Sequence, residues 1–298
     1  MPTDFATTPD IQEAYAYCER LAKTHYENFS VGTWFLPKRL RPPMYSVYGF
    51  CRHTDDLGDE AEGDRLALLD QWEEDLRRCE SGSPEHPILR ALQQSMRERH
   101  IPLDPFLKLI EANRMDQRIK RHPTYADLLH YCEHSANPVG RMVLYLFGYG
   151  DDERQRLSDA TCTALQFANF WQDIRRDYAA GRIYLPLEDM ERFGYSEDDL
   201  QNNVVNKNLR ELMAFEVDRA RALFREGARL VELVDGELRI DLRLFTLGGT
   251  SVLDAIERQD YDVLSKRPVV SKGRKLGLTL RAVTQLATSR LSGGVRRG

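Results

Sequence analysis

Several features that would place this chain in a specialised class are missing from its sequence. Its five cysteines are scattered, odd in number and never spaced Cys-x-x-Cys, so neither a disulfide framework nor a zinc knuckle is expected. The longest run without a charged residue or histidine, residues 160–172, is shorter than the ~20 apolar residues that a membrane span needs. No basic and then apolar signal segment opens the chain, so a cytoplasmic location is the default expectation.

An excess of positive charge is also missing. The 298 residues include 42 Lys and Arg against 47 Asp and Glu, which gives a net charge of −5 and no general case for a nucleic-acid partner. The nucleotide-binding patterns GxxxxGK[ST] and GxGxxG, the nucleophile pattern GxSxG and the di-iron pattern Glu-x-x-His are all absent. Nucleotide-dependent, serine-hydrolase and di-iron chemistry therefore have no support.

What the sequence does contain is helical periodicity. Apolar residues recur at a spacing of 3.6 through most of the chain, alternating strand patterns are almost absent, and no linker or internal repeat divides it. These patterns predict one all-α domain over residues 1–298, with a core at about 10–285 and disorder at 292–298. The predicted helices span about 10–27, 43–60, 64–81, 87–99, 103–120, 124–148, 151–180, 205–235, 240–265 and 271–290.

Two groups of acidic residues carry the candidate chemistry. Asp55 and Asp59 are four residues apart and so share one face of a helix. In the second group, Asn169, Asp173 and Asp177 recur at the same spacing, with Gln166 one turn earlier. The second helix is apolar on most sides, which predicts a central position, and buried carboxylates need a partner or a metal ion.

Magnesium matches both acidic groups. It is a hard cation that takes oxygen ligands and usually shares its sites between carboxylates, water and substrate phosphates. Two helices that each offer oxygens one turn apart are suited to hold Mg²⁺ with a diphosphate, whose departure the metal would promote. Arg52, three residues before Asp55, lies on the same helix face and is a candidate partner for that diphosphate.

The order of these motifs resembles the squalene/phytoene synthase family of head-to-head trans-isoprenyl diphosphate synthases. The resemblance covers about residues 10–285. It rests on Asn28-Phe29 before Leu36-Pro37, Tyr-Gly-Phe-Cys-Arg-His-Thr-Asp-Asp at 48–56, Tyr131-Cys132 before Val139-Gly140, Asn169-x3-Asp173-x3-Asp177, and Gly-Arg-Ile-Tyr-Leu-Pro at 181–186.

This resemblance implies a fold and a set of site residues. The fold is the all-α isoprenoid synthase fold, a helical bundle around a central active-site cavity. The implied Mg²⁺ ligands are Asp55, Asp59, Asn169, Asp173 and Asp177. The implied diphosphate contacts are Arg52, Gln166 and Arg267, and the implied substrate contacts on the first helix are His25, Asn28 and Phe29.

Within the family, residues 135–141 and 169–173 resemble the hydroxysqualene synthases of hopanoid biosynthesis. This chain has His134 where squalene and phytoene synthases tend to have a tyrosine, and Gln172 where they usually have arginine. The implied reaction ionises presqualene diphosphate and captures the rearranged cation with water, so no hydride and no nicotinamide cofactor are needed. His134 is either a catalytic base or a polar neighbour. Pro138 either kinks a helix, freeing a carbonyl for that water, or starts one.

Two other functions stay open at this point. A second head-to-head enzyme would condense two farnesyl or geranylgeranyl diphosphates to presqualene diphosphate, squalene or phytoene with the same metal ligands. A non-catalytic lipid-binding or assembly protein is disfavoured, because such a protein would be expected to lose metal-binding carboxylates that are all present here.

The last part of the chain is basic. From residue 263 to the end there are nine Lys or Arg and no Asp or Glu, with apolar residues at helical spacing. Two interpretations are open: helix 271–290 docks peripherally on the anionic inner membrane surface, or its cations serve the diphosphate and the solvent.

Overall fold

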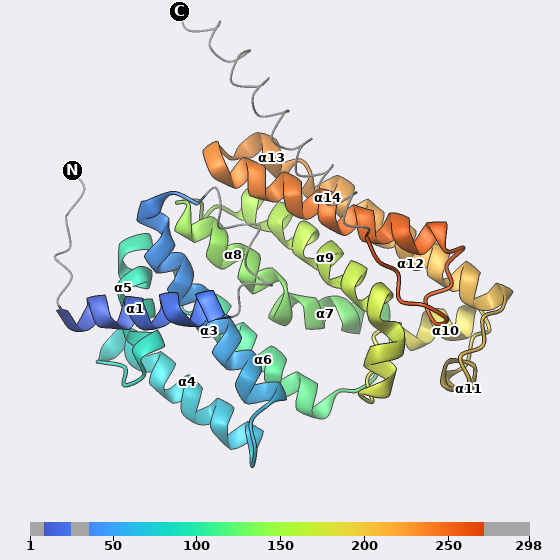
Figure 1. The fold of residues 1–298 in the computed structure, drawn as a ribbon, viewed down its shortest axis with the longest axis horizontal. Coiled ribbons are helices and arrows are strands. Elements are labelled where there is room, and N and C mark those ends of the chain that lie inside the picture. Colours follow the sequence, from blue (N-terminus) through green and yellow to red (C-terminus); the bar gives the residue numbers. More distant parts are fainter. Residues whose placement is uncertain (1–8, 25–35, 271–298) are drawn as a thin grey trace, which may run out of the picture. The chain divides into compact units, whose positions relative to one another are not determined.

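A computed structural model describes residues 9–24 and 36–270 of the chain (Figure 1). Within these two ranges the secondary structure is helical without any β-strand, and a single parallel bridge joins Arg121 and Ile183. The predicted all-α class is confirmed. No helix in the described ranges combines the length and the apolar character needed to cross a membrane.

The chain divides into two compact units. One comprises residues up to Ile119 together with Glu133–Gln155, and the other comprises Lys120–Cys132 and the chain from Arg156 onward. The helices of the first unit are α1 (Pro9–Thr24), the 3-10 helix η1 (Lys38–Leu40), α3 (Arg41–Asp59), α4 (Arg65–Ser81), α5 (Pro87–Arg99), α6 (Asp104–Arg118) and α8 (Asn137–Leu146). The second unit holds most of α7 (Tyr125–Ser135) and of α9 (Asp152–Ala179), with α10 (Leu187–Arg192), α11 (Glu197–Gln201), α12 (Lys207–Gly227), α13 (Leu230–Leu233) and α14 (Gly236–Arg258).

The helix predicted over 124–148 is wrong as a single element. It is two helices, α7 and α8, separated at Ala136, and Pro138 lies in the first turn of α8. A proline is tolerated there because the first backbone N–H groups of a helix have no partner within it. Of the two interpretations of Pro138, the helix start agrees with the bounds of α8.

Other boundaries also differ from the prediction. The helix expected over 205–235 ends at Gly227 and is followed by the separate short helix α13, and the helix expected over 240–265 runs from Gly236 to Arg258. The short helices η1, α10 and α11 were not predicted. The segment 271–290 and the disordered end predicted at 292–298 lie outside the described residues, so both remain predictions.

Helix α3 is the centre of the first unit. It packs against α1, α4, α5, α6 and α8 (Figure 1). On its buried face, the Phe50 ring contacts Trp72 of α4 and Phe106 of α6, with ring centroids 5.6 and 5.1 Å apart. Pro42 lies in the first turn of α3, where its missing N–H costs nothing. Because its flanks are packed on several sides, α3 is a rigid carrier for the acidic residues in its last turns.

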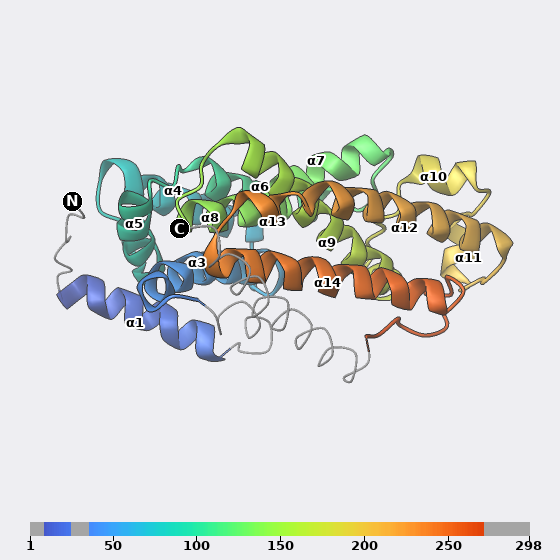
Figure 2. The ribbon, with the colours of Figure 1, turned by 90° about the horizontal axis from the view of Figure 1, so that it is seen from above.

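In the second unit, α9 comes close to α12 at Gly227 and to α14 at Gly249. Helices α12 and α14 lie side by side in both views of the molecule (Figures 1 and 2). A Cβ placed on Gly227 of α12 would lie 2.1 Å from the Thr161 hydroxyl of α9, so only glycine permits this approach. The contact fixes the N-terminal half of α9, and with it the direction of its acidic C-terminal half.

A buried charge cluster connects α10 and α12 within the second unit. The Arg219 guanidinium lies between the rings of Tyr125 and Phe215, 4.1 and 4.2 Å from their centroids, and forms ion pairs with Asp189 and Glu216. Glu216 is fully buried, and its Oε2 has no hydrogen-bond partner. Burial raises the pKa of Glu216 to about 8, against the opposing effect of Arg219.

This raised pKa predicts a pH-dependent stability. Between about pH 5 and pH 8 the folded chain keeps a proton on Glu216 that the unfolded chain has lost, so stability falls as pH rises. The slope is at most about 1.4 kcal/mol per pH unit. Urea unfolding of E216Q at pH 5.5, 6.5 and 7.5 is expected to show a shallower decline than the wild type.

The matched control for this prediction is E257Q. The Glu257 carboxylate bonds to Arg221, which lowers its pKa, so its titration is complete below the tested range. The difference between E257Q and wild type is therefore expected to be constant from pH 5.5 to 7.5. Parallel stability curves for E216Q and wild type would contradict the prediction.

Candidate active site

The first acidic group lies in the last turns of α3, as the spacing predicted. Asp55 and Asp59 are both exposed to solvent and are close enough for the charge of Asp59 to act on Asp55. Although Asp55 reaches the surface, the protein atoms packed around its carboxylate reduce its hydration and raise its pKa to about 6. The Asn113 amide opposes this shift, and Asp59 adds to it. Two carboxylates that disfavour each other's charge form a site that a cation would stabilise.

Asn113 of α6 is a residue of this site that the sequence interpretation missed. Its Nδ2 atom donates to Asp55 Oδ1 at 3.5 Å and to the Leu109 carbonyl at 3.1 Å. The approach of α6 depends on Gly58, because a Cβ there would lie 2.2 Å from Asn113 Oδ1. The available signal was a polar residue four positions after Leu109, on the apolar face of the predicted helix over 103–120.

Arg52 bonds to acidic residues other than the predicted metal ligands. Its guanidinium pairs with Asp56 one turn later, and its Nη2 atom lies 2.8 Å from Glu60 Oε1. The Arg52 Nε atom is buried and has no hydrogen-bond partner. The structure thus places Arg52 on the same helix as Asp55, with its guanidinium bonded to Asp56 and Glu60.

His134 belongs to the same unit as Asp55 but lies on another helix. It is half-buried near the end of α7, two residues before the break at Ala136. The remaining residues predicted to contact substrate, His25, Asn28 and Phe29, lie outside the described residues.

The second acidic group lies in the C-terminal half of α9. Helical spacing places Gln166, Asn169, Asp173 and Asp177 along one side of this helix, as predicted. Asn169 is exposed, whereas Gln166 and Asp177 are half-buried. The neighbouring residues Phe167 and Trp171 are fully buried, which explains why the polar side keeps a fixed orientation.

Arg267, from the segment after α14, binds directly to Asp173. Its Nε donates to Asp173 Oδ1 at 2.6 Å and its Nη2 to Oδ2 at 2.8 Å, so the contact is bidentate. Arg267 Nη2 also donates to Gln172 Oε1 at 3.0 Å. The Arg267 guanidinium lowers the pKa of Asp173 below its usual value.

Asp177 has the opposite electrostatic character. Desolvation raises its pKa to about 7, the charge of Asp173 adds to the shift, and Arg182 and Arg176 oppose it. Two carboxylates one turn apart on α9 therefore differ: Asp173 is paired with an arginine, whereas Asp177 resists ionisation.

The motif at residues 181–186 holds Arg182 close to Asp177. Helix α9 ends in a Schellman turn: the Arg182 N–H donates to the Asp177 carbonyl at 2.8 Å, and Gly181 has φ of +81°. The Ile183 N–H then donates to the Lys120 carbonyl at 2.9 Å. Tyr184 stacks on Phe170 with ring centroids 3.8 Å apart.

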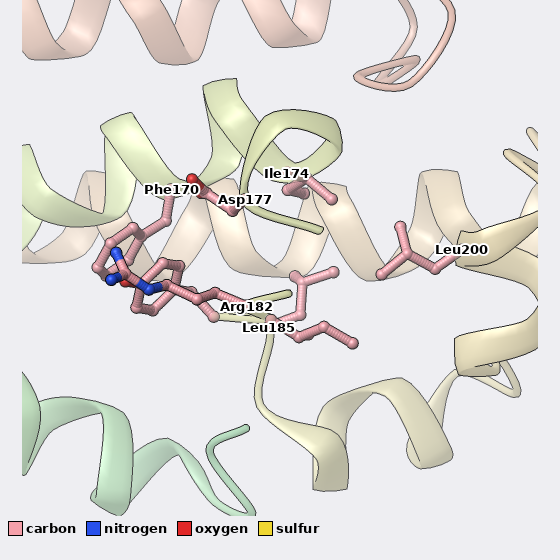
Figure 3. A pocket seen from close by; sticks show the side chains of 8 residues that line it. Phe170, Ile174, Asp177, Arg182, Leu185 and Leu200 are labelled. Atoms are coloured by element: carbon pink, nitrogen blue, oxygen red, sulfur yellow. The ribbon is translucent and has the colours of Figure 1, made fainter. Parts of the chain in front are cut away.

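A small cavity lies beside this turn. Figure 3 shows Asp177 and Ile174 of α9 lining it together with Arg182 and Leu185 of the following segment. Its volume of about 10 Å³ is close to the minimum for one water molecule. It is too small to hold a prenyl chain.

The donor chemistry of these residues fits Mg²⁺. Among the described residues, no three or more His, Cys, Asp or Glu side chains are grouped to hold a metal ion by themselves. Each unit instead supplies two carboxylates one helical turn apart, Asp55 with Asp59 and Asp173 with Asp177. Mg²⁺ commonly takes one or two carboxylates and completes its coordination with water and phosphate oxygens.

Comparisons with known proteins identify the family of this chain. The squalene/phytoene synthase family model matches residues 22–274. The squalene synthase HpnC from Alicyclobacillus acidocaldarius is 53% identical and superposes with a TM-score of 0.83, over 86% of this chain and 97% of that chain. A dehydrosqualene synthase solved with a ligand is 30% identical, also with a TM-score of 0.83, over 94% of this chain and 98% of that chain.

A sequence relative gives the same result. The 15-cis-phytoene synthase of Synechococcus elongatus is 33% identical over 280 residues, which is 89% of this chain and 91% of that protein. The predicted family and the predicted fold class are confirmed. The chain belongs to the squalene/phytoene synthase family.

Proposed function

We propose that this protein is a Mg²⁺-dependent triterpene synthase that converts presqualene diphosphate to hydroxysqualene. The observation that carries the proposal is the pair of acidic groups, each with two carboxylates one turn apart on a rigid helix, in a chain of this family. The 53% identity to the squalene synthase HpnC supports a C30 product.

Each residue has a proposed role in this reaction. Mg²⁺, when bound, stabilises the negative charge that develops on the leaving diphosphate. Arg52, Gln166 and Arg267 contact the diphosphate, and His25, Asn28 and Phe29 contact the substrate. The Mg²⁺ ligands are Asp55, Asp59, Asn169, Asp173 and Asp177.

The proposed reaction begins with heterolysis of the carbon–oxygen bond, whose electron pair leaves with the diphosphate. The resulting carbocation rearranges, and one water molecule adds to it. His134 is the proposed acceptor of the proton that this water releases. No hydride donor takes part, so no nicotinamide cofactor is proposed.

A second candidate function uses the same residues. In it, the protein condenses two farnesyl or geranylgeranyl diphosphates head-to-head to squalene, phytoene or presqualene diphosphate. The similarity to a 15-cis-phytoene synthase and a dehydrosqualene synthase favours this candidate. A non-catalytic lipid-binding protein is a remote third candidate, disfavoured because both acidic groups are intact.

Product analysis distinguishes these functions. The purified full chain is incubated with Mg²⁺ and presqualene, farnesyl or geranylgeranyl diphosphate, and the lipids are identified by mass spectrometry. We expect hydroxysqualene from presqualene diphosphate and no product in EDTA. Squalene, phytoene or presqualene diphosphate from the shorter substrates would favour the second candidate. The double variant D55A/D173A is expected to form no product while its circular dichroism is unchanged.

A further inference from the structure

We propose that Arg267 and a divalent cation compete for the carboxylate of Asp173, and that Gln172 is the residue that positions Arg267 for this competition. The inference rests on the proposed function, because it concerns one of the proposed metal ligands. It concerns a competition at the site: the cation meets a carboxylate that an arginine already holds.

The competition follows from the geometry of the ion pair. Arg267 engages both carboxylate oxygens, at 2.6 and 2.8 Å, so neither oxygen is left without a guanidinium partner. The Asp173 side chain is only 20% exposed, which strengthens a charge-assisted bond relative to a fully solvated pair. A cation that approaches Asp173 therefore meets a carboxylate whose charge and hydrogen-bonding capacity are already partly taken by Arg267, and the two compete.

Gln172 holds the arginine in this place. It is buried, its Oε1 accepts from Arg267 Nη2 at 3.0 Å, and its Nε2 donates to the Pro268 carbonyl at 2.5 Å. One side chain thus fixes both the guanidinium and the backbone of the next residue. A guanidinium that is oriented before binding loses less conformational entropy when it pairs with a carboxylate.

Displacement of Arg267 has a consequence for the second ligand. Once the cation has taken Asp173, the Arg267 N–H groups are available to an anion such as a diphosphate. Cation and diphosphate are then expected to bind with positive coupling. The cation frees Arg267 for the diphosphate, and the diphosphate binds the arginine that would otherwise compete with the cation for Asp173. By itself, the cation is expected to bind weakly.

A neighbouring arginine provides a matched control. Arg176 also lies near Asp173, but through a single 3.4 Å contact to Oδ1, and its side chain is 72% exposed. Loss of Arg176 removes one positive charge from the same turn without freeing a carboxylate oxygen from a bidentate bond. The change in Mn²⁺ affinity caused by R176Q therefore measures the contribution of one nearby positive charge alone.

The test is a Mn²⁺ titration of the full-length protein without substrate, followed by electron paramagnetic resonance. R267Q and R267K are expected to bind Mn²⁺ about three- to tenfold more tightly than wild type, since both lose the bidentate bond. Q172L, which keeps Arg267 but not its orientation, is expected to shift in the same direction by about twofold or more. R176Q is expected to change affinity by less than about twofold.

The charge-conserving variant decides the outcome. If Arg267 weakened Mn²⁺ binding only through its positive charge, R267Q would bind Mn²⁺ more tightly but R267K would bind it like wild type. This result would overturn the proposal. Failure of wild type and all variants to bind Mn²⁺ would also overturn it. Addition of inorganic pyrophosphate is expected to raise Mn²⁺ affinity more in wild type than in R267Q, and an equal gain in both would count against the coupling. Absence of a lipid product would refute the proposed function without changing these titrations.

Discussion

Replacement of Asp177 by asparagine is expected to abolish product formation and, at the same time, to stabilise the fold at pH 8. The loss of activity should be about a thousandfold or more, because a neutral amide replaces the carboxylate of a proposed Mg²⁺ ligand. The gain in stability follows from the pKa of Asp177, which is raised to about 7, so that the folded wild type holds an unfavourable charge at pH 8.

The pH dependence of this gain is specific. Below about pH 4 Asp177 is protonated in both the folded and the unfolded wild type, and the two proteins should differ least in stability. As the pH rises from 4 to 8, the unfolded wild type ionises first, and the advantage of D177N should grow. Thermal unfolding in EDTA at pH 4, 6 and 8, together with product analysis in Mg²⁺, measures both effects.

The neighbouring ligand supplies the control with the opposite sign. Asp173 is stabilised in its charged form by Arg267, so D173N is expected to lose activity and also some stability at pH 8. A D177N protein that is less stable than wild type at pH 8 would contradict the desolvation of Asp177, and one that retains activity would contradict its proposed role as a Mg²⁺ ligand.

The largest expected contrast in stability is between two adjacent glycines of α14. Gly248 is exposed, and a Cβ placed on it would meet nothing within 4 Å, so G248A should stabilise the helix by about 0.5–1 kcal/mol. A Cβ on Gly249 would lie 2.3 Å from Phe224 Cζ and 2.9 Å from Leu165 Cδ2. G249A is therefore expected to destabilise the protein by about 1–3 kcal/mol.

Urea unfolding of both variants measures this contrast, and each serves as the control for the other because the backbone change is identical. Phe224 is buried in α12 and Leu165 belongs to α9, so the added methyl group in G249A should push α14 away from both helices. Equal stabilities of G248A and G249A would show that the packing between α9, α12 and α14 is looser than described.

The acidic groups and most long helices were predictable from the sequence, because each depends on residues close together in the chain. Asp173 and Asp177 share a side of α9 through the helical repeat alone. The break at Ala136 was left as one of two interpretations, because a proline can either kink a helix or start one. Helix α11 was missed because five residues are too few for a period to appear.

Local sequence patterns did not predict contacts between residues that are far apart in the sequence. The resemblance assigned Arg267 to a diphosphate, but nothing in the sequence indicates that it binds Asp173, 94 residues away. Asn113 and Asp55 come together only because Gly58 lets α6 approach α3. Such tertiary contacts form only where two surfaces have complementary shapes, and the periodicity and spacing of residues do not reveal those shapes.

The turn at Gly181 has a consequence for the motion of Asp177. The last turn of a helix normally frays, and a residue two positions before its end would spend time unwound. Here the Schellman bonds, the Phe170–Tyr184 stack and the hydrogen bond to Lys120 anchor the chain on both sides of that end. Amide protons of the final turn of α9 should therefore exchange with solvent as slowly as those of a helix interior.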